Sequence, residues 1–400
     1  MSERAFITLL SIIVGIFSGL AAVIIKNTVR LTQRLVDNLL KSEVHNYIYF
    51  ALPIFGIFLT VIVVKYVVRH HVRHGIPTVL YGISKQRGRI KNHNLYSSVI
   101  ASSLTVGFGG SVGLEGPTVA TGTAWGSWLA KMFRLNYKNT ILILASACAG
   151  AMAAIFKAPI AAIVFAVEVI MIDLTVFSLV PLLLSSATGV VTSYLFLGQD
   201  VLYPFEIKDM FVLGDIPYYV ALGIITGFIS VYFIKSFLFI SNKFDRMRNN
   251  KNRLLVGGIS LGTLIFFFPS LYGEGYESIN SCLAGNLDYL FNNSLFYGLK
   301  DQMWAAFVLL AAVILLKIIA MSITFGSGGV GGIFAPTLFM GVNTGMFFSM
   351  LINLTGIRHV NTNNFALIGM AGLIAGVLHA PLTGIFLIAD LTGGYKMFVP

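Results

Sequence analysis

Charged residues and cysteines are scarce in this chain of 400 residues. Asp, Glu, Lys and Arg make up only 11% of it, against the roughly 25% that is usual in soluble domains. Hydrophobic residues make up 56%, and the mean hydropathy is +0.84. This balance excludes an ordinary soluble protein and predicts an integral membrane protein. The two cysteines, Cys148 and Cys282, lie in different sequence environments, so we expect no disulfide framework.

Acidic residues are scarcer than basic ones: the chain has 16 Asp and Glu against 27 Lys and Arg, which gives a net charge of +11. Basic residues gather in segments 65–91 and 235–253, and acidic residues gather in 200–215 and 274–288. Because the basic segments flank apolar runs, we expect them at the cytoplasmic face of a membrane. The same placement disfavours a nucleic-acid partner, which would call for a basic surface on a folded domain.

Apolar runs alternate with glycine-rich breaks along the whole chain. The clearest runs are 6–25, 49–68, 141–156, 218–239, 254–268 and 307–323. Several are shorter than the roughly 20 residues that a simple membrane span needs, so we expect tilted and broken helices. The pattern predicts helices over 5–38, 95–106, 158–172, 175–198, 216–247 and 252–268, further spans from 302, and a polar re-entrant region over 278–293.

An internal repeat divides the chain into two halves. Segment 107–126 matches segment 326–345 at an offset of 219, with glycines, a proline and a threonine at equivalent positions. Segment 149–168 matches 371–390 at an offset of 222. Such repeats are typical of transporters whose halves are related by a two-fold axis. We expect a first repeat of about 5–198 and a second of about 216–400 in the opposite orientation. The second ends before the equivalent of the last span of the first, so the chain looks truncated.

The glycine-rich breaks favour an anion site. Each comes directly before a predicted helix, whose N-terminus presents unpaired N–H groups and the positive end of the helix dipole. The second break has no acidic side chain, so its backbone amides are free to coordinate an anion. The first break carries Glu115, whose carboxylate can occupy the same position. We therefore expect Glu115 to act as a gate and proton acceptor. The expected anion-binding residues of the breaks are Gly113, Gly116, Gly332, Ile333, Phe334 and Ala335.

Other chemistry receives little support from the sequence. Ser111 fits a nucleophile-elbow pattern, but no strand precedes it, so we do not expect an enzyme. His70, His71 and His74 have no acidic or cysteine partner nearby in the sequence, so we expect neither a metal nor another cofactor. Glu168 and Asp390 occupy equivalent repeat positions near helix ends and are interpreted as boundary carboxylates.

Three ordered motifs resemble those of the CLC family of chloride channels and chloride/proton antiporters. They are Gly113-Leu-Glu-Gly-Pro117, which resembles the GxEGP gate motif, Gly332-Ile-Phe-Ala-Pro336, which matches GxFxP, and His74-Gly-Ile-Pro77 at the place of GSGIP. The resemblance implies an all-α membrane fold of two inverted-topology repeats and a homodimer with one anion pathway per subunit. It also implies chloride or a similar small anion as the transported ligand, protons as a second one in the antiporters, and an anion site that includes His74, Gly75 and Ile76. The expected location is the inner membrane of a bacterium.

This chain departs from the family pattern at functional positions. His74 replaces the serine that touches the anion in family members, which leaves the preferred anion open. The internal proton glutamate of the antiporters falls at Val169, as in channel-type members, and this favours weak or absent proton coupling. The pore tyrosine is expected beyond Pro400, and Tyr395 is not its equivalent. A chloride/proton antiporter remains one alternative, and a cation-coupled carrier of an organic anion remains another.

Overall fold

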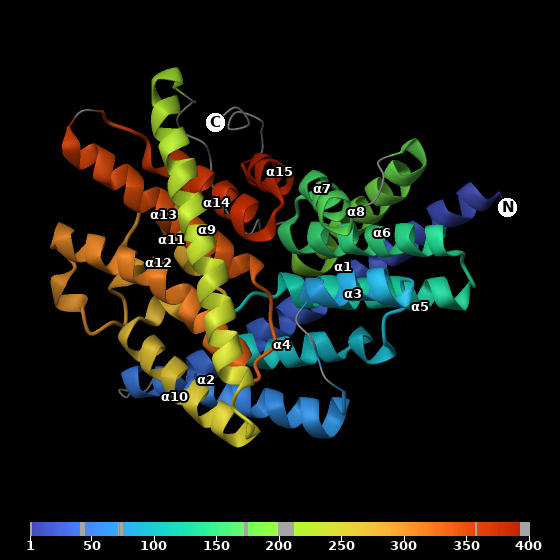
Figure 1. The fold of residues 1–400 in the computed structure, drawn as a ribbon, viewed down its shortest axis with the longest axis horizontal. Coiled ribbons are helices and arrows are strands. Elements are labelled where there is room, and N and C mark those ends of the chain that lie inside the picture. The colour runs from blue at the N-terminus through green and yellow to red at the C-terminus, as the bar shows by residue number, and fades with distance from the viewer. Residues whose placement is uncertain are drawn as a thin grey trace.

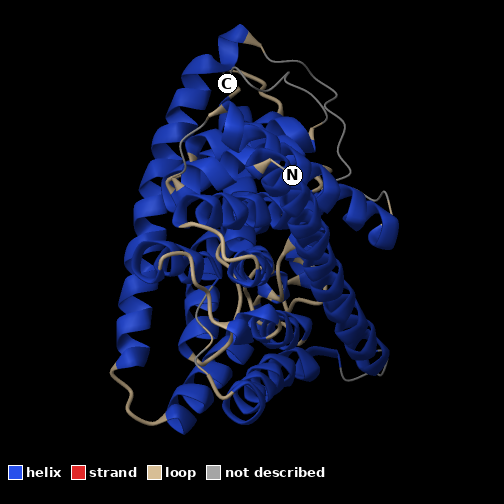
Figure 2. Ribbon diagram, turned by 90° about the vertical axis from the view of Figure 1, so that its right-hand side faces the viewer, coloured by secondary structure: helices blue, strands red, loops and turns tan. Residues whose placement is uncertain are grey.

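The chain folds almost entirely into α-helices. The computed structural model describes residues 2–40, 45–70, 72, 75–171, 175–198, 212–356 and 358–392, and Figure 2 shows no strand among them. Its α-helices are α1 (Glu3–Leu40), α2 (His45–Ile62), α3 (Gly75–Gln86), α4 (Ser97–Gly107), α5 (Glu115–Met132), α6 (Tyr137–Phe156), α7 (Pro159–Ile170), α8 (Val176–Leu197), α9 (Ile216–Asp245), α10 (Asn250–Phe267), α11 (Tyr276–Leu283), α12 (Met303–Gly326), α13 (Phe334–Thr355), α14 (Thr362–Leu378) and α15 (Pro381–Leu391). A π-helical segment, Val63–Val68, extends α2.

Seven helices in the described ranges are long and apolar enough to cross a membrane, whereas α4, α7, α14 and α15 are shorter apolar helices. This confirms a multi-pass membrane protein with broken helices. Burial differs sharply between the long helices. In the most apolar stretch of α6, 94% of the residues are buried inside the protein, against 17% in the α9 stretch. A helix that is apolar on all sides must be covered by protein or lipid, so α6 is a central helix, and α9 lies at the outside of the described helices.

The two halves of the sequence form two groups of helices (Figure 1). Helices α5 to α8, in green, lie beside α12 to α15, in orange and red, and α15 packs against α7. Packing also crosses this division elsewhere: α2 of the first half packs against α10 of the second. The glycine-rich breaks lie where α5 meets α13.

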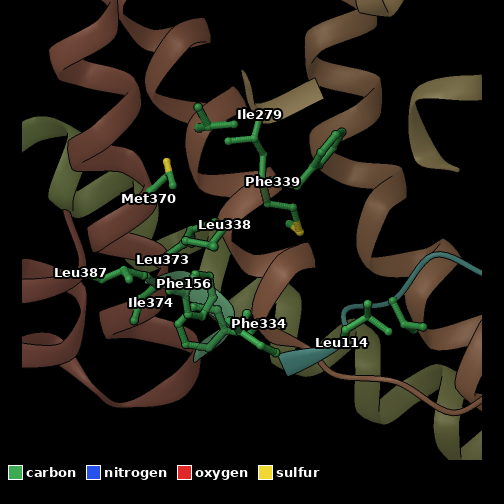
Figure 3. Close-up of a cluster of buried hydrophobic side chains, with 14 of the residues drawn as sticks. Leu114, Phe156, Ile279, Phe334, Leu338, Phe339, Met370, Leu373, Ile374 and Leu387 are labelled. Atoms are coloured by element: carbon green, nitrogen blue, oxygen red, sulfur yellow. The ribbon is translucent and has the colours of Figure 1, made fainter. Parts of the chain in front are cut away.

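A buried aromatic cluster joins the halves next to the breaks (Figure 3). The ring of Phe334, at the start of α13, lies beside that of Phe156, 5.1 Å between ring centres. It lies 6.1 Å from the ring of Phe165. All three side chains are fully buried. Because lipid is as apolar as a protein core, such contacts hold membrane helices together by close packing rather than by a hydrophobic driving force. The start of α13 is thereby fixed against α6 and α7.

Most predicted helices are present with small shifts at their ends. Within the predicted re-entrant region, α11 ends at Leu283 and a 3-10 turn follows at Asp288–Leu290. The helix after the first break begins at Glu115, two residues before Pro117. Its first turn is closed by a hydrogen bond from the Thr118 amide to the Leu114 carbonyl, and Pro117 fits because a first-turn residue needs no donor.

Candidate functional site

The backbones of the two glycine-rich breaks pair with each other. The amide of Gly113 donates to the carbonyl of Gly332 at 2.8 Å, and the amide of Gly332 donates to the carbonyl of Gly113 at 2.7 Å. The result is an isolated antiparallel bridge between the two repeats. Irregular backbone inside a membrane must find its hydrogen bonds within the protein. The two breaks supply them to each other.

Two threonines strengthen this pairing, and the sequence analysis did not identify them. The hydroxyl of Thr324 accepts a hydrogen bond from the amide of Ser111 at 3.2 Å, and that of Thr105 accepts one from the amide of Val330 at 3.0 Å. Thr105 and Thr324 are identical at the same offset of 219, just outside the segments that were compared. Extending the repeat by two residues would have found them.

Helices α5 and α13 begin at the bridge without side-chain caps. The residues before them, Leu114 and Ile333, make no side-chain cap hydrogen bond. Thr118 and Thr337 direct their hydroxyls back to the carbonyls of these same residues, at 2.9 and 2.8 Å. No Ser, Thr, Asp or Asn at the N-cap position therefore occupies the first amides of either helix. Uncapped N-termini with their positive dipole ends are the elements that bind anions.

The start of α3 joins the other two helix starts. A Cβ on Gly75 would lie 2.6 Å from the Cα of Gly116, and one on Gly332 would lie 2.8 Å from the amide nitrogen of Gly116. Only glycine allows three backbones to approach so closely. The structure thus brings together four predicted residues, Gly75, Gly113, Gly116 and Gly332. Ile76 is half-buried and follows directly, whereas His74 lies outside the described residues.

Glu115 lies between the two facing helix starts, and its side chain is fully buried. Its Oε1 accepts a hydrogen bond from the hydroxyl of Tyr276, the first residue of α11. Its Oε2 lies against Gly113 near the start of α13, where the Ala335 amide also interacts with the carboxylate. The carboxylate that belongs to α5 thus reaches the N-terminus of α13. Tyr276 is a site residue that no sequence pattern signalled, because its contact joins segments that lie 161 positions apart.

The other residues predicted in the second break differ in what their side chains contact. Phe334 directs its ring into the aromatic cluster with Phe156 and Phe165. Ile333 is half-buried and packs against the main core, and Ala335 is fully buried. What this turn presents towards Glu115 is therefore backbone rather than side chain.

Glu168 and Asp390 cap helices of the opposite repeat. Glu168 of α7 accepts hydrogen bonds from the amides of Leu382 and Thr383 at the start of α15, at 3.1 and 2.9 Å. Asp390 of α15 accepts bonds from the amides of Ile160 and Ala161 at the start of α7, both at 3.0 Å. Both carboxylates thus have a structural role. A carboxylate from another helix thus occupies each of these two helix starts, as the carboxylate of Glu115 reaches the start of α13.

The residues of the disfavoured chemistries have ordinary surroundings. The hydroxyl of Ser111 is buried and has no hydrogen-bond partner in the described part of the chain. The ring of His70 stacks on that of His93 at 4.8 Å, while His71 is not among the described residues. Cys148 and Cys282 are buried free thiols.

A cavity of about 430 Å³ is lined by Tyr276, the residue whose hydroxyl donates to Glu115. Its wall includes Tyr49, Tyr272, Glu274, Tyr276, Glu277 and Asn293. We call it the vestibule. Helix α10 begins in the basic segment 235–253 and leads to the loop before α11, which borders the vestibule.

Known proteins match this chain over nearly its whole length. A family model described as "Voltage gated chloride channel" matches residues 55–400. An "H(+)/Cl(-) exchange transporter ClcA" of Vibrio cholerae serotype O1 is 28% identical over 98% of this chain and 83% of its own. A "Putative chloride channel protein ClcB-like" of Ralstonia nicotianae is 30% identical over 75% of this chain and 67% of its own.

A solved structure of a slow cyanobacterial Cl-/H+ antiporter superimposes with a TM-score of 0.81 at 20% identity, covering 100% of this chain and 92% of that one. At this identity the likeness speaks for the fold, and it confirms the expected fold of two inverted repeats. Together with the family match over residues 55–400, it places the chain: this protein belongs to the voltage gated chloride channel family, the CLC family.

Proposed function

We propose that this protein carries chloride or a similar small anion across the membrane, and that Glu115 is the gate of the pathway. The observation that carries the proposal is the position of Glu115. A fully buried carboxylate reaches the uncapped start of α13, where the backbone amides favour negative charge. A carboxylate in such a position stands in for a transported anion.

The mechanism follows from competition for one site. The amides at the start of α13 and the glycine backbones of Gly75, Gly116 and Gly332 form a site of partial positive charge without a lysine or arginine in the break. Such a dipolar site binds an anion and also releases it. When the carboxylate of Glu115 is protonated, or when an anion displaces it, the site opens. Ile76, Ile333 and Phe334 contribute backbone or apolar wall, and His74 is proposed to affect the choice of anion.

Two modes of transport fit this gate. Val169 stands where family antiporters carry the internal proton glutamate, and here it is a half-buried apolar residue packed on the core. This supports an anion conductor with weak or absent proton coupling. The alternative, a chloride/proton exchanger, is supported by the name of the Vibrio cholerae relative. In either mode we propose a homodimer with one pathway per subunit, located in the inner membrane of a bacterium.

The test is anion flux from liposomes that contain the purified protein. We expect chloride to leave chloride-loaded vesicles faster than it leaves protein-free vesicles, with no requirement for sodium. A rate equal to that of the protein-free vesicles contradicts the proposal, and a strict need for sodium favours a cation-coupled carrier. A pH electrode in the same chamber separates the two modes, because only the exchanger moves protons uphill along a chloride gradient.

A further inference from the structure

A second carboxylate, that of the half-buried Glu274, borders the vestibule and interacts with Glu115. It belongs to the loop Gly273–Gly275 just before α11, and the loop is rigidly built. Gly273 and Gly275 have φ angles of +62° and +89°, which other residues rarely adopt. The amide of Gly273 donates to the carbonyl of Gly109 in the first glycine-rich break at 3.3 Å. The loop that carries Glu274 is thus tied to the break that carries Glu115.

A buried lysine holds the same loop from the other side. Lys317 of α12 is completely buried, and its Nζ donates to the carbonyl of Gly273 at 3.1 Å and to that of Leu271 at 3.4 Å. It also lies 4.8 Å from the centre of the Phe339 ring. A buried cation in a membrane protein is costly unless it is paired, and such groups mark functional sites by default. Its charge partner is Glu274.

The charges around Glu274 come from every element that packs on it. Lys26 of α1, Lys317 of α12 and Glu115 of α5 all interact with it electrostatically, and the amide of Leu114 donates to its carboxylate. Lys26 is fixed by a 2.6 Å hydrogen bond to the carbonyl of Ile155, and Arg30 and Lys157 lie beyond it. Glu274 and Glu115 are thus the two acidic groups, and Lys26 and Lys317 the two basic groups, of this cluster.

One oxygen of Glu274 is available for a proton. Its Oε1 is buried and has no hydrogen-bond partner among the described residues. Glu274 is also part of the vestibule wall, together with Tyr49, Tyr272, Tyr276, Tyr289 and the exposed Glu277. A buried carboxylate oxygen without a donor is unfavourable, and a proton removes the negative charge that burial penalises.

We propose that Glu274 is a second proton-binding carboxylate, which takes a proton from the vestibule and sets the pH at which Glu115 opens the pathway. This inference rests on the proposed gating role of Glu115. The proton comes from vestibule water and returns to it, so no other reactant is needed. Because two like charges near each other disfavour double ionisation, Glu274 in its charged form favours a proton on Glu115, and the two carboxylates titrate as a pair.

The experiment measures chloride efflux from liposomes at a series of pH values equal on both sides. For the unaltered protein we expect chloride efflux to rise as the pH falls. The dependence of efflux on pH should be steeper than the titration of one proton-binding group. Glu274→Gln removes the negative charge that favours protonation of Glu115. We therefore expect the half-activating pH to fall by about one unit, a tenfold increase in the proton concentration required, and the curve to become that of a single proton. Glu274→Ala gives the same expectation without placing an amide in the buried position, should the Gln variant not fold.

Two comparisons separate this role from a structural one. Glu277→Gln, three positions along the same wall but exposed, should leave the curve unchanged. In a Glu115→Gln background, Glu274→Gln should have no further effect on efflux. An unaltered half-activating pH in both Glu274 variants, or an equal change of efflux in the Glu115→Gln background, overturns the inference and leaves the gate intact. Efflux of the unaltered protein that does not depend on pH contradicts the gate itself.

Discussion

Gly113 and Gly332 exchange both backbone hydrogen bonds, at 2.8 and 2.7 Å, although they lie in different repeats. This bridge brings together the N-termini of α5 and α13 and pairs backbone groups that a membrane interior would leave without partners. It also places the carboxylate of Glu115 against the opposite helix start. The candidate site is thus a product of the repeat: neither break forms it without the other.

The gate is tested most directly at Glu115. Glu115→Gln keeps the size of the side chain and removes the charge that competes with the anion. We expect chloride efflux from liposomes at neutral pH to rise and its dependence on pH to disappear. Asp301→Asn, an exposed acid, serves as the control and should behave like the unaltered protein. A Glu115→Gln protein that keeps the normal pH dependence would show that another group is the gate.

Tyr276 should control how firmly Glu115 holds its position. Tyr276→Phe removes the hydroxyl that donates to Oε1 of Glu115. A hydrogen bond to a charged group contributes about 1.5–3 kcal/mol, and here it favours the charged, blocking form. Without it, protonation becomes easier, so the half-activating pH of chloride efflux should rise by about one unit. The direction is opposite to that expected for Glu274→Gln. No shift, or a shift to lower pH, would contradict a stabilising contact.

Because the backbones approach so closely at Gly332, we expect a larger side chain at this position to disturb the bridge. A methyl group there would lie 2.8 Å from the amide nitrogen of Gly116, so the bridge must open to admit it. We expect Gly332→Ala to reduce stability by about 1–3 kcal/mol and to abolish most chloride efflux. The matched control is Gly223→Ala in α9, where nothing lies within 4 Å of the added carbon. Thermal unfolding in detergent and efflux are measured on both, and equal behaviour would argue against the close packing.

The reciprocal caps predict a stability effect without a gating effect. Asp390→Ala removes the acceptor for two amides at the start of α7. Loss of a helix cap costs about 0.5–2 kcal/mol, so the unfolding temperature in detergent should fall. The protein that remains folded should keep the half-activating pH of the unaltered chain, because the Asp390 caps are made to α7 rather than to Glu115. A changed half-activating pH with an unchanged unfolding temperature would assign Asp390 to transport instead.

Much of the fold could be predicted because membrane helices leave strong local signals. Long apolar stretches such as α12 require no tertiary information, and the repeat located both breaks and Glu115. The boundaries were harder. Helix α5 begins at Glu115, two residues before Pro117, since the hydrogen bond that closes its first turn depends on the local backbone conformation. Phe334 belonged to the expected anion site, and the structure adds that its ring belongs to the aromatic cluster.

By itself, the sequence determined that this is a membrane protein of two related halves, with one carboxylate in one of two glycine-rich breaks. Those properties can be read along the chain. They depend on amino-acid composition, on the spacing of apolar residues and on residues that are identical at a fixed offset between the halves. Only the tertiary structure decided what surrounds that carboxylate. Tyr276, Glu274 and Lys26 approach Glu115 from separate elements, and Lys317 interacts with Glu274. Hydrogen bonds and charge interactions act through space, so residues that meet this way need share no pattern along the chain.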